Sequence, residues 1–362
     1  MTFPPDTARA WVDIDLGALV ANARTLAEAC RTRLLPMVKA NGYGLGAAQV
    51  ASALDALDPW GFGVATVEEA VALRASGVSR PMLVVSPLSP ESLEPVLEHG
   101  FRPAIGDPAM LQRWIARSAG AFHLEIDSGM ARAGIRWDDE AALREAARAL
   151  AFAPGWEGAF THFHSADSDP SSVAMQWRRF QSVLSALPRR PSLVHAANSA
   201  AALCGSAYAA DLVRPGIFLY GGRAGDSAPA PRPVAALRAR VLAVRSVAPG
   251  EGVSYGATWR APRPTTVATL GIGYADGLLR AAEWKDDGLS RQVELRGRPV
   301  PLVGRVTMDM SMVAVDDGQV AVGDVATVFG GIVSLDEQAR SSGTISYELL
   351  TALGNRLPRR YR

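Results

Sequence analysis

Lysine is almost missing from this sequence. Only two of its 37 basic side chains, Lys39 and Lys285, are lysines, and the other 35 are arginines. A codon preference for arginine accounts for most of this ratio. It does not account for the two positions that keep an amine, so the chemistry available to each of them is worth establishing.

A surplus of charge and a long apolar run are absent too. The chain has 37 basic and 36 acidic side chains, a formal net charge of +1, whereas proteins that coat nucleic acid or adsorb to membranes need excess positive charge. No apolar run reaches the roughly 18 residues of a membrane span, and the N-terminal segment lacks the apolar core of a signal peptide. We therefore expect a cytoplasmic protein with no nucleic-acid or membrane partner.

Cysteine is equally scarce. Cys30 and Cys204 are the only two, and they lie far apart in alanine-rich surroundings that resemble helices. Their number and separation favour buried thiols in a reducing compartment over a disulfide framework or a metal site. We expect no bound metal.

Eight short apolar runs alternate with helix-like segments. The runs lie at 34–40, 61–66, 81–86, 101–105, 122–127, 158–164, 192–198 and 211–217. Continuous apolar strands separated by amphipathic helices predict an α/β fold, a parallel sheet covered by helices, and eight units in about 200 residues match a (β/α)8 TIM-like barrel. A doubly wound open sheet would show the same alternation and stays the structural alternative.

The residue composition of the sequence changes after a Gly/Pro/Ala-rich stretch at 221–233. Beyond it the segments are short, rich in valine and threonine, and separated by glycine and proline, a pattern typical of β-strands and turns. We expect a barrel domain over residues 1–233 and a mostly-β domain over 234–362. Residues 8–16 resemble a strand that adds to the second domain.

Polar side chains stand at the ends of the apolar runs. Lys39 ends the first run, and Asp127, His162, Asn198 and Arg214 lie at the ends of later ones. The C-terminal ends of barrel strands form the active-site face, where a partly desolvated lysine has a lowered pKa and can form a Schiff base with an aldehyde. A lysine that merely extends to solvent is the alternative, and the shared location of the other polar groups favours chemistry.

Nine motifs are spread along the chain: PMVKANGYGLG, IDSGMARAG, THFHSAD, HAANSAA, RPGIFLYG, VSYGATW, GIGYADG, GRVTMDM and ISYELLTALGNRLPRRY. In this order, and over nearly the whole chain, they resemble the bacterial alanine racemases. The resemblance implies a pyridoxal 5'-phosphate enzyme of fold type III, an isomerase that interconverts L- and D-alanine for peptidoglycan. It also implies a head-to-tail homodimer.

Three other functions remain open on the sequence. The first is a serine or broad-specificity racemase of the same fold. The second is a barrel protein that only carries pyridoxal phosphate, and the β domain argues against it. The third is a basic amino-acid decarboxylase, whose Cys-Asp motif is missing, because Cys30 and Cys204 precede arginine and glycine.

The resemblance assigns the acid/base chemistry to two residues. Lys39 would hold the cofactor covalently and act on one face of the substrate Cα, while Tyr255 of the partner subunit would act on the other, because racemisation removes a proton from one face and returns it to the opposite one. A tyrosine, with an ordinary pKa of about 10, needs help to act as a base. The resemblance gives that help to His162 and Arg214, and Arg214 would also donate to the pyridine nitrogen.

The remaining assignments concern binding, and they too follow from the resemblance. The cofactor phosphate and its surroundings would be held by Tyr43, Asn198, Ser199, Gly216, Ile217 and Tyr347. Arg132 would contact the phenolate oxygen of the cofactor and the substrate carboxylate, and Met308 of the partner subunit would give a backbone N–H to that carboxylate. The entrance channel would be narrowed by Tyr274, Arg305 and Asp309.

Several positions depart from the family pattern. Glu125 stands where the family often has a carbamylated lysine, so we expect the same sign of charge on a shorter side chain, with a gap to Arg132 that an ion or water fills. Thr307 replaces a frequent cysteine, and Gly42 and Leu45 alter the loop after Lys39.

Overall fold

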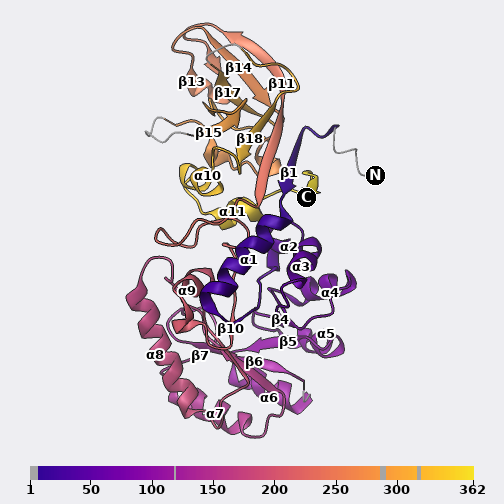
Figure 1. The fold of residues 1–362 in the computed structure, drawn as a ribbon, viewed down its shortest axis with the longest axis vertical. Coiled ribbons are helices and arrows are strands. Elements are labelled where there is room, and N and C mark those ends of the chain that lie inside the picture. Colours follow the sequence, from indigo (N-terminus) through magenta and orange to yellow (C-terminus); the bar gives the residue numbers. More distant parts are fainter. Residues whose placement is uncertain (1–6, 118–119, 286–290, 316–318) are drawn as a thin grey trace.

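Two domains lie end to end along the long axis of the molecule (Figure 1). The computed structural model describes residues 7–117, 120–285, 291–315 and 319–362. The α/β domain runs from indigo to pink in Figure 1, and the β-rich domain is orange and yellow. The boundary that we place between residues 233 and 234 stays a prediction.

The first domain is built on parallel strands at each of the eight predicted runs. They are β2 (Arg33–Leu34), β3 (Phe62–Val64), β4 (Met82–Val84), β5 (Arg102–Ile105), β6 (Phe122–Asp127), β8 (Trp156–Phe160), β9 (Leu193–His195) and β10 (Leu212–Val213). Their order is β2-β10-β9-β8-β6-β5-β4-β3, and β7 (Ile135–Arg136) pairs only with β6. A parallel bridge between Met37 and Gly63 joins the two ends. The sheet is therefore closed, which confirms the predicted barrel and excludes the open sheet.

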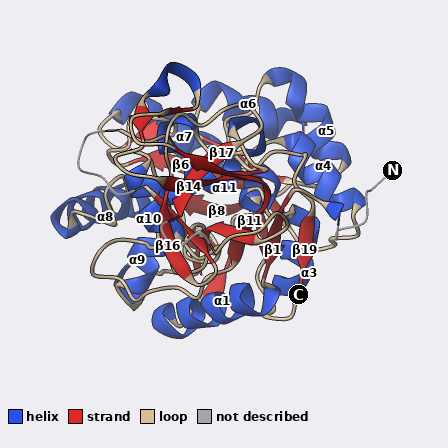
Figure 2. Ribbon diagram, turned by 90° about the horizontal axis from the view of Figure 1, so that it is seen from above, coloured by secondary structure: helices blue, strands red, loops and turns tan. Residues whose placement is uncertain are grey.

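Helices surround the barrel strands, as the view down the long axis shows (Figure 2). They are α1 (Leu16–Cys30), α3 (Ala47–Asp55), α4 (Val67–Ala75), α5 (Leu93–Glu98), α6 (Pro108–Arg117), α7 (Glu140–Leu150), α8 (Pro170–Ala186) and α9 (Ser199–Leu203). Side-chain caps set several of their starts: the Asp139 carboxylate, for example, accepts from the N–H of Ala142 at the first turn of α7. In the described part of the chain, none of the helices has the length and apolarity needed to cross a membrane.

The second domain is mostly β, as predicted. Its main sheet contains β1 (Ala10–Ile14), β11 (Ala235–Val247), β14 (Thr265–Leu270), β15 (Gln292–Leu295), β16 (Arg298–Pro301), β17 (Ser311–Val315), β18 (Val325–Phe329) and β19 (Arg359–Tyr361). A small hairpin adds β12 (Gly252–Val253) and β13 (Trp259–Arg260). Strand β1 pairs antiparallel with β11, placing Ala10 opposite Ala239, so the start of the described chain lies in this sheet.

Two short helices carry the second domain down to the barrel. They are α10 (Leu335–Ser341) and α11 (Ser346–Thr351), and α11 contacts α2 (Lys39–Tyr43) at the mouth of the barrel. The approach is close: a Cβ on Gly44 would lie 2.2 Å from the carbonyl oxygen of Leu350. Because Gly44 also has a φ of +79°, glycine is required there on both counts, and it fixes how α11 sits over the barrel.

The two cysteines differ in environment. Cys30 is buried at the end of α1, whereas Cys204 is exposed just after α9, and both are free thiols. The expectation of two buried thiols is therefore wrong for Cys204. The helix α9 is only five residues long, and Cys204 falls beyond its end rather than on its packed face.

Candidate active site

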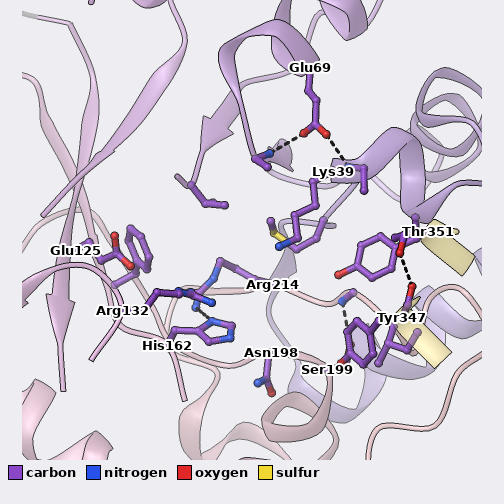
Figure 3. A pocket seen from close by; sticks show the side chains of 18 residues that line it. Lys39, Glu69, Glu125, Arg132, His162, Asn198, Ser199, Arg214, Tyr347 and Thr351 are labelled. Carbon is purple, nitrogen blue, oxygen red and sulfur yellow. Dashed lines mark hydrogen bonds between the residues drawn. The ribbon is translucent and has the colours of Figure 1, made fainter. Parts of the chain in front are cut away.

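A cavity of about 530 Å³ opens at the C-terminal ends of the barrel strands, and α11 contributes Tyr347 and Thr351 to its wall. Figure 3 shows the side chains that line it. This volume is typical of a site for small molecules. Ten residues that the sequence assigns to binding or chemistry line it: Lys39, Tyr43, Arg132, His162, Asn198, Ser199, Arg214, Gly216, Ile217 and Tyr347. Glu125 lines it as well. Residues from the ends of β2, β6, β8, β9 and β10 and from the second domain thus meet in one space.

Lys39 is presented by an unusual backbone segment. Residues 40–44 all have positive φ values, between 52° and 79°, a conformation that costs roughly 1–2 kcal/mol for each residue other than glycine. The Glu69 carboxylate stabilises it by accepting hydrogen bonds from the N–H of Ala40 (2.7 Å) and from the N–H of Ala65 (2.8 Å). Strain of this kind persists where surrounding contacts hold it, and here it fixes the position from which the lysine extends.

The electrostatic surroundings favour a reactive amine at Lys39. Burial lowers the pKa of Lys39, the positive charge of Arg132 lowers it further, and the carboxylate of Glu69 opposes both. A lowered pKa increases the fraction of neutral amine at neutral pH, and the neutral amine is the nucleophile that attacks an aldehyde. Lys285, by contrast, is exposed, as predicted for a solvated surface charge.

Tyr43, Ser199 and Gly216 form a cradle suited to an anion. The N–H of Gly216 lies 2.9 Å from the Ser199 hydroxyl oxygen, and a Cβ on Gly216 would fall 2.3 Å from the Tyr43 hydroxyl. Tyr347 of α11 faces Tyr43 with 6.0 Å between ring centroids. Burial raises the pKa of Tyr347 to about 12 and that of Tyr43 still higher. Both phenols therefore remain protonated donors, as an anionic group requires.

Arg214 lies buried in the floor of the cavity. Its guanidinium donates to the carbonyls of Thr161 (2.7 Å) and Ala196 (3.1 Å), and it lies 3.3 Å from Nδ1 of His162 (Figure 3). Burial lowers the pKa of Arg214 to about 10, so it is still a cation at neutral pH. Burial, followed by the charge of Arg214, lowers the pKa of His162 to about 3. His162 is therefore neutral. Because the guanidinium can only donate, Nδ1 of His162 accepts and the single ring proton of His162 is on Nε2.

Glu125 faces the same cavity from β6. Only 5% of its surface is exposed, and burial raises the pKa of its carboxyl group to about 7, although the charges of Arg132 and Arg214 act in the opposite direction. Within the described residues, no direct hydrogen bond or ion pair joins Glu125 to Arg132. This arrangement agrees with the gap that we expect between the two side chains.

Five predicted residues are not among those that line the cavity. Tyr255, Tyr274, Arg305, Met308 and Asp309 all lie in the second domain and gather in a cluster of their own. The hydroxyl of Ser254 donates to the Arg305 carbonyl (2.8 Å), and the N–H of Tyr274 donates to the Thr307 carbonyl (3.0 Å). The Tyr255 side chain is 70% exposed. The single chain thus presents two separate groups of site residues.

The cavity also contains residues that sequence reasoning missed. Glu69 holds the backbone next to Lys39, and Phe160 lies under Arg214 with 5.0 Å between the guanidinium carbon and the ring centroid. Behind the cavity lining, the buried Tyr220 stacks on Tyr43 at 4.4 Å and donates to the carbonyl of Met37. Tyr220 belongs to the RPGIFLYG motif and could have been found there. Glu69 gives no such signal, because a glutamate in the first turn of a helix is ordinary.

Comparison with known proteins covers both domains. The family model of the alanine racemase N-terminal domain matches residues 14–224, and that of the alanine racemase C-terminal domain matches residues 234–361. The alanine racemase of Deinococcus radiodurans is 41% identical over 364 residues, which span 97% of this chain and 99% of that protein. That of Geobacillus kaustophilus is 36% identical over 371 residues, with 96% and 93% covered.

Solved structures agree with the sequences. The alanine racemase from Bartonella henselae, crystallised with covalently bound pyridoxal phosphate, matches with a TM-score of 0.90 and 32% identity over 98% of this chain and 100% of that one. The biosynthetic alanine racemase from Pseudomonas aeruginosa matches with a TM-score of 0.89 and 34% identity over the same shares. Motif order, both domains and the fold lead to one conclusion, which confirms the resemblance: this chain belongs to the alanine racemase family.

Proposed function

We propose that this chain is an alanine racemase, a pyridoxal 5'-phosphate enzyme that interconverts L- and D-alanine. One observation carries the proposal: an amine of lowered pKa, Lys39, shares a cavity with an anion cradle and a buried guanidinium. These three groups suit the aldehyde, the phosphate and the ring nitrogen of that cofactor. Membership of the family supports the same substrate and cofactor.

The residues present would hold the cofactor at three points. Lys39 would bind its aldehyde carbon, the Gly216 N–H with the neighbouring hydroxyls of Tyr43, Ser199 and Tyr347 would bind its phosphate, and Arg214 would donate to its ring nitrogen. When bound, the cofactor supplies an aromatic ring that withdraws electrons from the substrate Cα. Because Arg214 keeps its own proton, it would leave the ring nitrogen unprotonated and so limit the withdrawal of electrons by the ring. Arg214 would in this way favour rapid return of the proton to Cα, and therefore racemisation over transamination.

Proton transfer to the second face of Cα needs another base. Lys39 can serve one face, but His162, with a pKa of about 3, is too weak a base for the other, and the raised pKa of Tyr347 makes it unsuitable too. We infer that Tyr255 of the partner subunit fills this role in a homodimer, with Met308, Tyr274, Arg305 and Asp309 alongside it. The exposure of Tyr255 and its cluster supports this inference.

The biological setting completes the proposal. We place the enzyme in the cytoplasm, where its two free thiols stay reduced, and we assign its D-alanine to peptidoglycan synthesis. The product fits a small cavity, part of which the cofactor would occupy.

An isotope experiment tests this function. Purified protein loaded with pyridoxal phosphate is mixed with L-alanine in deuterated water. The alanine enantiomers are separated, and the deuterium content of each is measured by mass spectrometry. We expect D-alanine that carries deuterium at Cα, because the returning proton comes from a base that has equilibrated with solvent. Serine, tested in parallel, should react far more slowly. Absence of deuterated D-alanine would refute the proposal.

Glu125→Gln should weaken substrate binding. The carboxylate of Glu125 is charged above about pH 7 and supports the neighbouring Arg132, which would hold the substrate carboxylate. We expect KM for alanine to fall as the pH rises through about 7 in the natural protein. In the Gln variant this step should vanish and KM should stay about tenfold higher, the equivalent of about 1.4 kcal/mol. Steady-state kinetics between pH 6 and pH 8, in the range where the carboxyl titrates, measure the difference.

Two further measurements control this prediction. Added bicarbonate should leave the activity of the natural protein unchanged, because Glu125 has no amine to carbamylate. The folded-state pKa of about 7 lies above the ordinary value of 4.5, so Glu125 lowers the free energy of unfolding as the pH rises through that window. Without cofactor, the Gln variant should therefore have the higher Tm at pH 8 and above. A bicarbonate requirement, or an unchanged KM in the Gln variant, would contradict the role of Glu125.

A further inference from the structure

A row of four polar side chains crosses the interior of the barrel. Arg214 lies with Nη1 2.7 Å from Nδ1 of His195, and Nε2 of His195 lies 2.7 Å from Nδ1 of His123. Nε2 of His123 in turn lies 3.3 Å from the carboxylate of Glu157. Arg214 follows β10 at the active-site end, whereas Glu157 and His123 stand near the starts of β8 and β6. The row therefore joins the cavity to the opposite end of the barrel.

Each hydrogen bond in this row has a fixed direction. The Arg214 guanidinium can only donate, so Nδ1 of His195 accepts and the proton of His195 is on Nε2. That proton is donated to Nδ1 of His123, whose own proton is consequently on Nε2 and is donated to Glu157. Burial lowers the pKa of both histidines, so each carries one proton. Four groups thus allow one pattern of donors and acceptors.

Two local features of β8 make room for the row. Phe122 pairs with Trp156 and His123 with Gly158, so Glu157 is an extra residue, a β-bulge that turns its carboxylate towards His123. A Cβ on Gly158 would lie 2.5 Å from Nδ1 of His123. Any larger residue at this position would displace the imidazole. Neither the bulge nor the glycine is needed to close a barrel.

Arg214 has no carboxylate in direct contact, and Glu125, which lines the same cavity, acts on its charge only at longer range. Within the described part of the chain, the partners of the Arg214 guanidinium are backbone carbonyls and imidazoles, and no carboxylate forms an ion pair with it. Glu157 remains ionised: burial alone would raise its pKa, but the hydrogen bond from His123 and the charge of Arg102 hold the pKa below its ordinary value. In a low-dielectric interior, hydrogen bonds in series polarise one another. The row can thus convey part of the Glu157 charge to Arg214.

We propose that Glu157 and His123 are positioning residues for Arg214, acting through His195 to fix the imidazole protons and to hold the guanidinium as a donor towards the cofactor's ring nitrogen. This inference rests on the proposed function, because that nitrogen belongs to pyridoxal phosphate. Glu157 acts from the far end of the barrel and touches neither substrate nor cofactor. His123 loses its one acceptor if Glu157 is removed, and an unpaired buried donor destabilises the arrangement that holds Arg214.

The test uses protein labelled with 15N-histidine and loaded with pyridoxal phosphate. Long-range proton-nitrogen NMR spectra at neutral pH, assigned by replacing each of the five histidines in turn, report which ring nitrogen carries the proton. We expect Nε2–H for both His195 and His123. In Glu157→Gln the amide oxygen still accepts but the charge is lost, so the His195 signals should shift, kcat should fall by about tenfold and KM should change by less than about twofold.

Asp13→Asn is the matched control. The Asp13–Arg238 and Glu157–Arg102 ion pairs both measure 3.2 Å, with carboxylate exposures of 23% and 26%, but Asp13 contacts no histidine among its described partners. This variant should leave the His195 signals and kcat unchanged. A proton on Nδ1 of either histidine in the natural protein would overturn the proposal even if the Gln variant failed to fold. So would unchanged His195 signals or unchanged kcat in Glu157→Gln. If the protein did not racemise alanine, the proposed function would fail, while the NMR spectra would still report the proton positions.

Discussion

Replacing Lys39 by alanine should lower the rate of racemisation by about 10⁴-fold or more, because the change removes both an acid/base group and the covalent link to the cofactor. Lys39 directly precedes the left-handed segment 40–44, whose first N–H is held by Glu69, and burial lowers the pKa of Lys39. No other lysine can take its place, since Lys285 is exposed in the second domain. Chiral chromatography of alanine measures the rate.

The covalent link can be measured separately from turnover. Borohydride reduction followed by peptide mass spectrometry should find the cofactor on the peptide that contains Lys39 in the natural protein and on no peptide of the Ala variant. Lys39→Arg keeps the positive charge but cannot form a Schiff base, and it should be as inactive as the Ala variant. Lys285→Arg should be silent. Cofactor that remains covalently bound in Lys39→Ala would refute the assignment.

The scarcity of lysine takes on a specific meaning in this light. A chain that uses arginine for nearly every basic position still has lysine where a guanidinium could neither join an aldehyde nor readily release a proton. Arg132 and Arg214, in contrast, occupy positions where a permanent cation is useful. The composition therefore leaves two positions that could require an amine, and the structure selects Lys39, because Lys39 lines the cavity and Lys285 is exposed.

The fold could be predicted from the sequence because its strands are buried on both faces. Such strands are continuously apolar, so the eight runs were visible without knowledge of their partners, and Val64, Val84 and Leu124 are all buried. The left-handed segment at 40–44 could not be predicted in the same way. Its conformation depends on the Glu69 carboxylate and on α11, which are distant in the sequence and oppose the local preference of alanine and asparagine.

Site residues could be predicted where a recognisable motif stands at the end of a strand. They could not be predicted where one residue acts through another. Ten cavity residues follow from motifs, but nothing in the residues around Glu157 distinguishes it from a surface glutamate. Its relation to Arg214 depends on a bulge and on two imidazoles contributed by other strands. A single sequence gives no measure of such distances, which explains why the row through the barrel emerges only from the structure.

Tyr255→Phe should slow racemisation strongly but spare part of the exchange chemistry. Each base serves one face of Cα, so Lys39 alone can still exchange the Cα hydrogen of one enantiomer with solvent. In deuterated water we expect deuterium to enter one enantiomer of alanine without forming the other, and the rate of racemisation to fall by about 10³-fold. Loss of exchange from both enantiomers, or full activity, would contradict the two-base assignment.

Mixed dimers decide which subunit supplies the tyrosine. Tyr255 is 70% exposed in the single chain, its neighbour Ser254 donates to the Arg305 carbonyl, and Tyr255 does not line the cavity that contains Lys39. If sites are shared, a dimer of one Lys39→Ala and one Tyr255→Phe subunit has one intact site, in which Lys39 of the second subunit meets Tyr255 of the first. Random reassembly of equal amounts should then restore about a quarter of natural activity. If each subunit used its own tyrosine, both sites of every mixed dimer would be defective and no activity would return.

The same mixture made with Lys285→Arg in place of Tyr255→Phe is the control. It should give about half of the natural activity whichever subunit supplies the tyrosine, because half of all sites then contain an intact Lys39 and every Tyr255 is present.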